Sequence, residues 1–325
     1  MTTQDSPDSL FILRGWFSVR QFFPSGNSDA DTVKVKIATA AMRTEAGEKN
    51  IYGELDDAYA VQLENGKTYH DKVLSSGAVT VRLQHIDAPE LHYVLGKTKF
   101  RQPRGVSSAR RVMEGLTWHA SDWIPCEVVT QVNHPSEAFD CYGRLVGDIL
   151  YGDERRNLNL QILESGLALP SLYDSASLDE RAAARAAARR GRKAFDTIWN
   201  DYTAALSFDP ALVLDPHDCG HDDDHGPVVL PKLFRRLAQC YTETGATDMP
   251  GFLAWLRVSS ERVMIERPGE PAHSLPLADI LALGADGSLR LTVEPEALVC
   301  LERASTMVLK RDDKYIPWTD ARPQA

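Results

Sequence analysis

One strand and the turn that ends it constrain the fold more than any other part of this sequence. The run Val79-Thr-Val-Arg-Leu-Gln-His-Ile86 is rich in β-branched and apolar residues, which is typical of a β-strand. Asp87-Ala-Pro-Glu90 follows at once, and Pro89 cannot donate a hydrogen bond to a neighbouring strand. The sequence therefore predicts a strand that ends in a turn carrying two carboxylates.

Other segments on both sides of this strand carry equally clear signals. Residues 10–40 indicate two strands around the turn Pro24–Asn27, and Asp31–Ile37 alternates as a half-buried strand does. Downstream we expect helices at Gly105–Leu116, Asn157–Ser165 and Leu178 to about Trp199, and strands at 126–132 and 145–150. This order favours an α+β fold in which helices pack on a small β-barrel.

The pattern changes after Trp199. A polar, acidic stretch comes first, and then Pro231–Glu243 is amphipathic. We expect a second helix at Phe252–Ile265 and strands at 288–293 and 297–301. A chain of 325 residues is long enough for two domains. The predicted organisation is a barrel domain at 1–204 with an insertion at about 40–78, an acidic His-rich linker at 205–230, and a small α+β domain of unknown role at 231–325.

Composition indicates the cellular compartment in which the protein is expected. No apolar stretch approaches the roughly 20 residues that span a bilayer, so no membrane partner is expected. The first ten residues lack the basic and apolar regions of a secretory signal. Five cysteines at scattered spacings do not form a disulfide framework. These features together predict a cytoplasmic protein with free thiols.

Charge is unevenly distributed along the chain. The net charge is −10, and most of the acidic excess lies after residue 200. Two cationic clusters occur in the first part, and a polyanion-binding enzyme needs only a few well-placed cations. A second interpretation, two solvated basic surfaces, stays open for both clusters. They comprise Lys97, Lys99, Arg101 and Arg104, and Arg181, Arg185, Arg189, Arg190, Arg192 and Lys193.

Three short segments carry the residue types that phosphodiester hydrolysis requires. They are Asp29-Ala-Asp31, the run from Arg82 to Glu90, and Asp140-Cys-Tyr-Gly-Arg144. Carboxylate and carbonyl oxygens bind hard divalent ions, and a carboxylate can orient or deprotonate a water molecule. Guanidinium groups bind the charged phosphoryl oxygens bidentately.

Each of these residues also has a purely structural interpretation. Asp31 and Asp87 can shape turns, Arg82 can extend its charged end from a buried strand to solvent, and Arg144 can pair with Asp140. Their joint occurrence, in this order, favours a catalytic site over four unrelated structural roles.

The segments resemble the thermonuclease family, also called staphylococcal-nuclease-like domains. The resemblance runs from about Gly15 to Trp199, and R-L-x-x-I-D-A-P-E and Y-G-R are its most specific motifs. It implies a five-stranded OB-type barrel with packed helices. It also implies a Ca²⁺-dependent endonuclease that cleaves DNA or RNA, prefers single strands and leaves 3′-phosphate products. Mg²⁺ or Mn²⁺ are the alternative ions.

The resemblance also implies a role for individual residues. Asp31 and Asp87 would bind the metal together with the backbone carbonyl of Ala88, and Asp29 would bind its outer water shell. Glu90 would act as the general base, while Arg82 and Arg144 would hold the scissile phosphate. The residues expected to contact substrate are Tyr142, Tyr173, Lys97, Lys99, Arg101 and Arg104.

Departures from the family pattern leave the substrate open. Cys141 stands where the family has a lysine, and Ala30 replaces a glycine between the two aspartates. The alternative function is a catalytically weak or inactive module that binds nucleic acid or protein. The C-terminal domain is expected to bind a protein partner or to mediate oligomerisation.

A histidine-rich segment lies in the expected linker. His217, Cys219, His221 and His225 occur among aspartates, and such residues can bind Zn²⁺. Their spacing matches no standard structural zinc site. The favoured interpretation is a solvated acidic linker, with a zinc site as the alternative.

Overall fold

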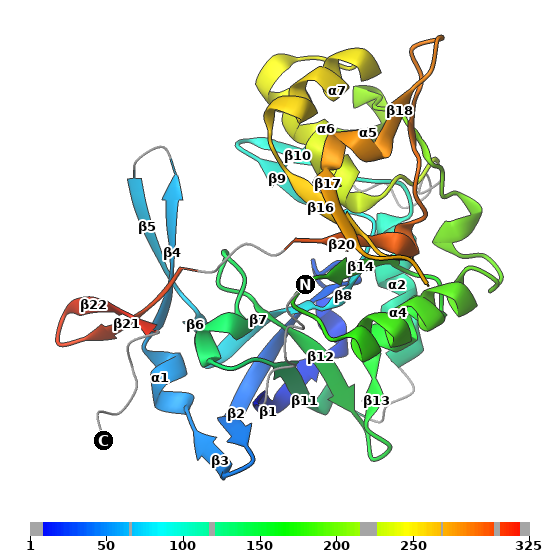
Figure 1. Cartoon of the computed structure of the whole chain (residues 1–325). Coiled ribbons are helices and arrows are strands. Elements are labelled where there is room, and N and C mark those ends of the chain that lie inside the picture. Colours follow the sequence, from blue (N-terminus) through cyan, green and yellow to red (C-terminus); the bar gives the residue numbers. More distant parts are fainter. Residues whose placement is uncertain are drawn as a thin grey trace.

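The computed structural model (Figure 1) describes residues 9–64, 67–116, 121–214, 226–267, 269–301 and 306–318. Its first part is a closed barrel of five strands. The strands are β1 (Leu10–Ser18), β2 (Thr32–Thr44), β7 (Ala78–Leu83), β11 (Trp123–Gln131) and β12 (Leu145–Tyr151). Four pairings are antiparallel, and the parallel pairing of β12 with β7 closes the barrel. The expected five-stranded OB-type barrel is confirmed.

Alternating burial explains why these residues form a barrel. In β7 every second side chain, from Val79 through Val81 to Leu83, is buried, so one face of the strand fills the interior. The same alternation occurs in β12. A buried cluster from all five strands, including Phe11, forms the core with apolar residues of the packed helices.

Helices cover one end and one side of the barrel. They are α2 (Gly105–Leu116), α3 (Leu158–Glu164) and α4 (Leu178–Gly191). Short strands β8 (His85–Asp87) and β14 (Leu169–Tyr173) pair antiparallel beside them. The helix predicted to run to Trp199 ends at Gly191, and a 3-10 turn follows at Ile198–Asn200. A Cβ on Gly191 would lie 2.0 Å from the carbonyl oxygen of Leu163, so this glycine permits the close contact between α4 and α3.

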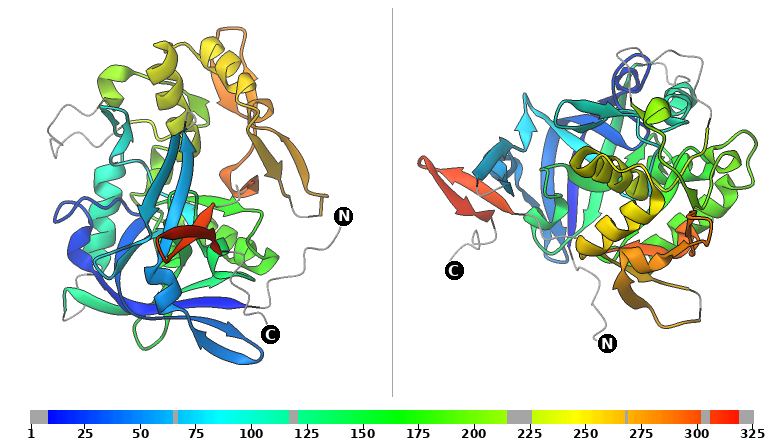
Figure 2. Two further views of the ribbon diagram at one scale, coloured as in Figure 1. Left: turned by 90° about the vertical axis from the view of Figure 1, so that its left-hand side faces the viewer. Right: turned by 90° about the horizontal axis from the view of Figure 1, so that it is seen from above.

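The chain between β2 and β7 forms a projecting arm. It contains β3 (Gly47–Asn50), α1 (Tyr52–Asp56), the hairpin of β4 (Ala58–Glu64) with β5 (Lys67–Lys72), and β6 (Leu74–Ser75). The last strands among the described residues are β21 (Met307–Arg311) and β22 (Lys314–Pro317), and they extend this hairpin because β21 pairs with β4. Figure 2 shows this red hairpin beside β4, away from the yellow helices.

The remaining C-terminal elements form a second apolar core above the barrel. They include α5 (Pro210–Val213), α6 (Pro231–Thr244), α7 (Met249–Val258) and the strands β15 (Ala205–Leu206), β16 (Arg262–Ile265), β17 (His273–Pro276), β18 (Leu281–Leu283), β19 (Leu289–Leu291) and β20 (Leu298–Cys300). The core includes Phe100 and Leu169 from the first part of the chain. Strand β20 also pairs parallel with β14, so the two parts share a sheet.

One predicted helix is only partly right. The apolar run Phe252–Ile265 contains the end of α7 and then strand β16, with a break between them. Ser260 has a φ of 51°, a left-handed conformation that a helix cannot continue through. No helix among the described residues is long and apolar enough to cross a membrane.

Candidate active site

The predicted site residues meet where β2 begins and β7 ends. Thr32 and Arg82 are partners across these two strands, so Asp31, directly before Thr32, lies next to Arg82. Strand β8 follows β7 after one turn residue and carries Asp87 at its end. Sheet register therefore brings together residues that are 51 positions apart in sequence.

Arg82 bridges the two aspartates expected to bind metal. Its Nη2 donates to Asp87 Oδ1 at 2.7 Å, and its Nη1 forms an ion pair with Asp31. Both aspartates are buried, with Asp87 only 1% exposed. Buried charges need paired partners, and here the guanidinium supplies them.

Asp31 is further held by the turn that follows β8. The Ala88 backbone N–H donates to Asp31 Oδ2 at 2.7 Å, and the Thr32 hydroxyl donates to Oδ1 at 3.1 Å. The Asp31 carboxylate is thus fixed in position by Thr32 of β2, by Arg82 of β7 and by the turn after β8. The Ala88 residue, proposed above to offer its carbonyl oxygen to a metal, lies at the same point.

Asp29 adds another carboxyl group, and its surroundings suit a bound cation. Burial raises the pKa of Asp29 well above its ordinary value, and the neighbouring charges of Asp31 and Glu90 raise it further. Among the described residues, no hydrogen-bond partner reaches its buried Oδ1. An excess of buried carboxylate oxygen beside Asp31 is the donor set that a hard divalent ion binds.

Arg235 from helix α6 occupies the other side of the same carboxylates. Its Nη2 lies 2.9 Å from Asp87 Oδ2 and its Nη1 lies 3.0 Å from Asp87 Oδ1. Nη1 also forms an ion pair with Glu90. Burial raises the pKa of Asp87, but the charges of Arg235 and Arg82 outweigh burial and hold that pKa below its ordinary value. Asp87 therefore stays ionised between two arginines.

Glu90 is largely buried beside three other charges. Burial raises its pKa above the ordinary value, the Arg235 charge opposes the rise, and the charges of Asp87 and Asp31 add to it. A raised pKa is what a carboxylate needs to accept a proton near neutral pH.

The backbone around Glu90 is tied directly to the segment that precedes α6. The Gln102 N–H donates to the Glu90 carbonyl oxygen at 2.8 Å, and the Gln102 side chain donates to the Val229 carbonyl oxygen. Gln102 is only 1% exposed. A Cβ on Gly105 would lie 2.8 Å from the same Glu90 oxygen. This packing sets the position of Arg235 relative to Glu90.

Arg144 lies on the tight turn between β11 and β12 and is not paired with Asp31, Asp87 or Glu90. Its Nε donates to Asp140 Oδ2 at 2.7 Å, and its guanidinium lies 5.5 Å from the centre of the Tyr142 ring. Gly143 has a φ of 76°, a conformation that favours glycine. A Cβ there would lie 2.9 Å from the Ala60 Cβ of strand β4, so the arm packs against this turn.

Tyrosines from three elements lie around the charged cluster. Tyr142 is exposed, whereas Tyr173 lies at the end of β14, near enough to Arg82 and Asp87 for their charges to affect its pKa. Burial raises that pKa. Tyr93, which the sequence did not single out, lies near enough to Arg235 and Glu90 for their charges to affect its pKa. It begins β9 (Tyr93–Leu95), which forms a hairpin with β10 (Thr98–Phe100).

The cationic segment after Glu90 divides into exposed and engaged residues. Lys97 and Lys99 are exposed on the β9–β10 hairpin. Arg104 instead forms ion pairs with Asp201 and, at 3.3 Å, Asp196. Arg101 is half-buried, and its backbone N–H donates to the Val213 carbonyl oxygen. The two lysines are therefore the members of this set that are open to an approaching polyanion.

Much of the second cationic cluster joins the two parts of the chain. Arg181 and Arg185 on α4 both form ion pairs with Glu266, and Arg192 pairs with Glu294. These contacts give the cluster a structural role at the interface with the C-terminal part. The histidine-rich segment His217–His225 lies outside the described residues.

Arg235 is the site residue that sequence reasoning missed. The amphipathic pattern of Pro231–Glu243 predicted its helix, and α6 is confirmed as Pro231–Thr244. Two consecutive arginines, Arg235 and Arg236, interrupt the apolar positions. That signal marks a charged helix face, but it does not say which surface the face will meet.

Comparison with known proteins gives one family match. Residues 80–201 match the family model described as "Staphylococcal nuclease homologue". This range begins within β7 and includes Arg82, Asp87, Glu90 and Arg144. No curated protein matches the chain.

Proposed function

We propose that this chain, which contains a staphylococcal nuclease homologue domain at residues 80–201, is a divalent-metal-dependent endonuclease that hydrolyses phosphodiester bonds in DNA or RNA. A largely buried charge cluster supports this function most strongly. In it Arg82 joins Asp31 to Asp87, and Arg235 joins Asp87 to Glu90. A cluster that only stabilised the fold would not need Asp29, whose buried Oδ1 has no hydrogen-bond partner among the described residues.

Asp31 and Asp87 are the proposed metal ligands, with the Ala88 carbonyl oxygen and with Asp29 binding through water. All-oxygen donors of this kind favour Ca²⁺, with Mg²⁺ or Mn²⁺ as alternatives. When bound, the ion supplies positive charge to the phosphoryl oxygens of the substrate. The raised pKa of Asp29 supports a place for such a charge, because burial and the adjacent carboxylates disfavour its ionised form.

Glu90 is the proposed base. Its side chain is about 12% exposed, so water can reach it while most of its surroundings stay dry. In the ionised form it can accept a hydrogen bond, and then a proton, from a water molecule that attacks phosphorus. Arg235 fixes one of its oxygens through the ion pair, which limits how that carboxylate can turn.

Arg82 and Arg144 are proposed to hold the phosphate. Arg82 is already oriented by two carboxylates, and its buried position makes each hydrogen bond to a phosphoryl oxygen strong. Arg144 is 34% exposed in its side chain and can exchange its contact with Asp140 for one with a phosphate. Charge that develops on the equatorial oxygens during displacement is then met by the Arg82 guanidinium from β7 and the Arg144 guanidinium from the turn before β12.

Arg235 has a different proposed role, as a counter-ion of the site carboxylates. It neutralises the Asp87 carboxylate that is expected to bind metal and the Glu90 carboxylate that is expected to act as base. A divalent ion must compete with it for Asp87. The C-terminal part of the chain thereby sets the concentration of metal at which the site becomes active.

The proposed substrate is a single strand of nucleic acid. Exposed Tyr142 offers an aromatic surface next to Arg144, and bases of any sequence can stack on such a surface. Lys97 and Lys99 lie on the hairpin that begins with Tyr93 and offer charge to the phosphate backbone.

A digestion assay tests this proposal. Labelled single-stranded DNA and RNA are incubated with the protein and Ca²⁺, and the product ends are tested for 3′-phosphate. We expect cleavage that EDTA abolishes and that Arg82→Ala reduces by a factor of about a hundred or more. Arg257→Ala, which changes an exposed arginine on α7, should cleave as the wild type does. Binding without cleavage under every ion would instead favour the inactive module.

A further inference from the structure

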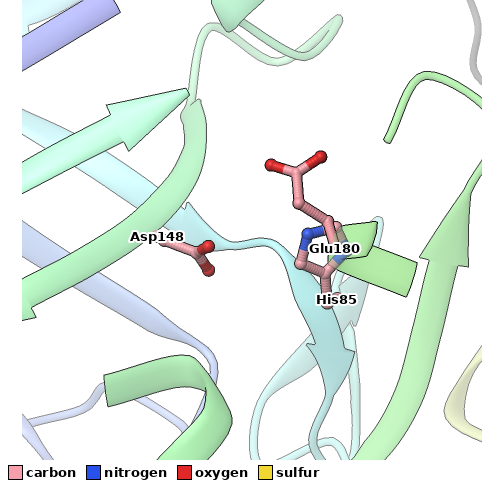
Figure 3. Close-up of side chains that lie close together, drawn as sticks. All are labelled: His85, Asp148 and Glu180. Atoms are coloured by element: carbon pink, nitrogen blue, oxygen red, sulfur yellow. The ribbon is translucent and has the colours of Figure 1, made fainter. Parts of the chain in front are cut away.

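A second cluster of metal-ligating side chains includes His85 of strand β8, two positions before Asp87 of the arginine-bridged site. His85, Asp148 and Glu180 come from β8, β12 and α4. One ligand atom of each lies within 4.8 Å of the other two. Figure 3 shows Asp148 directed toward the other two side chains, which come from separate ribbons. The chain thus gathers one imidazole and two carboxylates from three elements far apart in sequence.

His85 lacks the partners that a buried imidazole normally has. It is 3% exposed, and among the described residues neither Nδ1 nor Nε2 has a hydrogen-bond partner. Buried histidines normally satisfy at least one ring nitrogen. The φ of His85 is 68°, so the backbone adopts an uncommon conformation where it presents this ring.

The two carboxylates are partly engaged, because Gln84 and Asn157 hydrogen-bond to the Asp148 side chain and Ser177 hydrogen-bonds to Glu180. Within the described part of the chain, the buried Oδ1 of Asp148 also has no hydrogen-bond partner. Glu180 uses Oε2 to accept hydrogen bonds from the backbone and hydroxyl of Ser177, both at 2.8 Å, in the N-terminal cap of α4. This cap holds the Glu180 side chain at the beginning of the helix, beside His85.

We propose that His85, Asp148 and Glu180 bind one divalent transition-metal ion of the zinc class. One nitrogen and two carboxylate oxygens are donors that Zn²⁺ accepts, whereas Ca²⁺ strongly prefers oxygen alone. Around a tetrahedral ion with bonds of about 2.1 Å, ligand atoms lie roughly 3.4 Å apart. The ligand atoms therefore close by about 1.4 Å at most on binding, and water fills the fourth position. Two carboxylates and a neutral imidazole balance the charge of the ion.

The consequence is a cross-link inside the nuclease-homologue domain. The ion would join a barrel strand, the first turn of α4 and a residue two positions before Asp87. It would thus stiffen the strand that presents Asp87 without touching the substrate. Arg181, the nearest cation along α4, is engaged by Glu266 and by the carbonyl oxygen of Tyr173, so its charge is already compensated.

Zinc content of the full chain tests the site without relying on nuclease activity. Protein stripped with a chelator is given one equivalent of Zn²⁺, desalted and analysed by mass spectrometry. We expect close to one zinc per chain and a melting temperature higher by several degrees. Asp148→Asn and Glu180→Gln should lose both effects, and Gln at 180 keeps the helix-capping acceptor.

Controls separate this site from the other candidate ligands. Glu90→Gln should retain zinc, as should the triple variant His217→Ala, His221→Ala, His225→Ala. Co²⁺ in the wild type should give tetrahedral d–d absorption with no thiolate charge-transfer band, because the proposed ligands include no cysteine. The proposal is overturned if Asp148→Asn keeps its zinc, if only the triple variant loses it, or if Co²⁺ shows a thiolate band.

Discussion

Arg235 binds Asp87 across 148 residues of sequence, with Nη2 2.9 Å from Oδ2. The pair joins α6 of the C-terminal part to the end of β8 in the nuclease-homologue domain. The same guanidinium reaches Glu90. The C-terminal part therefore contributes directly to the charge balance of the proposed active site. Although this part is acidic overall, the residue that it supplies to the site is an arginine.

Removing this guanidinium should separate metal affinity from stability. In Arg235→Ala the carboxylates of Asp87 and Glu90 lose a buried partner, which costs about 3 kcal/mol of folding free energy without metal. Ca²⁺ then binds more tightly because no guanidinium competes for Asp87. Calorimetric titration and denaturant unfolding, with and without Ca²⁺, measure the two effects. Arg257→Ala should change neither, and an unchanged or weaker Ca²⁺ affinity in Arg235→Ala would contradict the counter-ion role.

The pH dependence of cleavage should report Glu90. A base works only when ionised, so kcat/KM should rise with pH through the pKa of Glu90, above the ordinary value of 4.5 because burial raises that pKa. Arg235 holds the same pKa down. Arg235→Gln should therefore shift the rise of kcat/KM to higher pH. If kcat/KM of Arg235→Gln, measured at saturating Ca²⁺, instead rises at lower pH than that of the wild type, Glu90 is excluded as the titrating base.

Asp31 should act through metal affinity more than through chemistry. Asp31→Asn keeps an acceptor oxygen for the Ala88 N–H but removes the charge that binds a cation. We expect the Ca²⁺ concentration for half-maximal cleavage to rise by a factor of about ten or more. The rate at saturating Ca²⁺ should fall less. Asp312→Asn, on the exposed turn between β21 and β22, is the matched control.

Buried His85 should make the metal-free protein sensitive to acid. Burial lowers its pKa from 6.5 to about 4, so the unfolded chain takes up the proton first as pH falls. Stability is fully present above pH 6.5 and declines toward pH 4, by about 3 kcal/mol in total. Urea unfolding in EDTA at pH 7 and pH 4.5 should show a smaller acid loss for His85→Leu. Equal losses would show that the imidazole is not buried in neutral form.

Local patterns in the sequence predicted the barrel and its helices well. A run of β-branched and apolar residues marked the strand that contains Arg82, and α2 begins and ends at the predicted residues, Gly105 and Leu116. The D-A-P-E turn placed Asp87 and Glu90 at a strand end because Pro89 interrupts pairing. These features depend on residues close together in the chain, which is why periodicity and turn chemistry reveal them.

The features that sequence patterns did not reveal depend on distant contacts. Helix α4 ends at Gly191, which packs against the carbonyl oxygen of Leu163 in α3, and this contact lies outside any local pattern. The approach of Arg235 to Glu90 joins positions 145 residues apart. Likewise, His85 is unremarkable in its strand until β12 and α4 bring Asp148 and Glu180 beside it. A single sequence carries no local signal for contacts between residues so far apart in the chain.

Glu90 is proposed to activate water for phosphodiester hydrolysis in this site. Single-turnover cleavage of labelled single-stranded DNA and RNA, compared between wild type and Glu90→Gln in Ca²⁺, Mg²⁺ and Mn²⁺, tests it most directly. Glu45→Gln, on the exposed turn after β2, serves as the matched control. We predict metal-dependent cleavage by the wild type and the control, and a rate lower by a factor of about a hundred or more for Glu90→Gln. Equal rates for wild type and Glu90→Gln with every ion would contradict the claim.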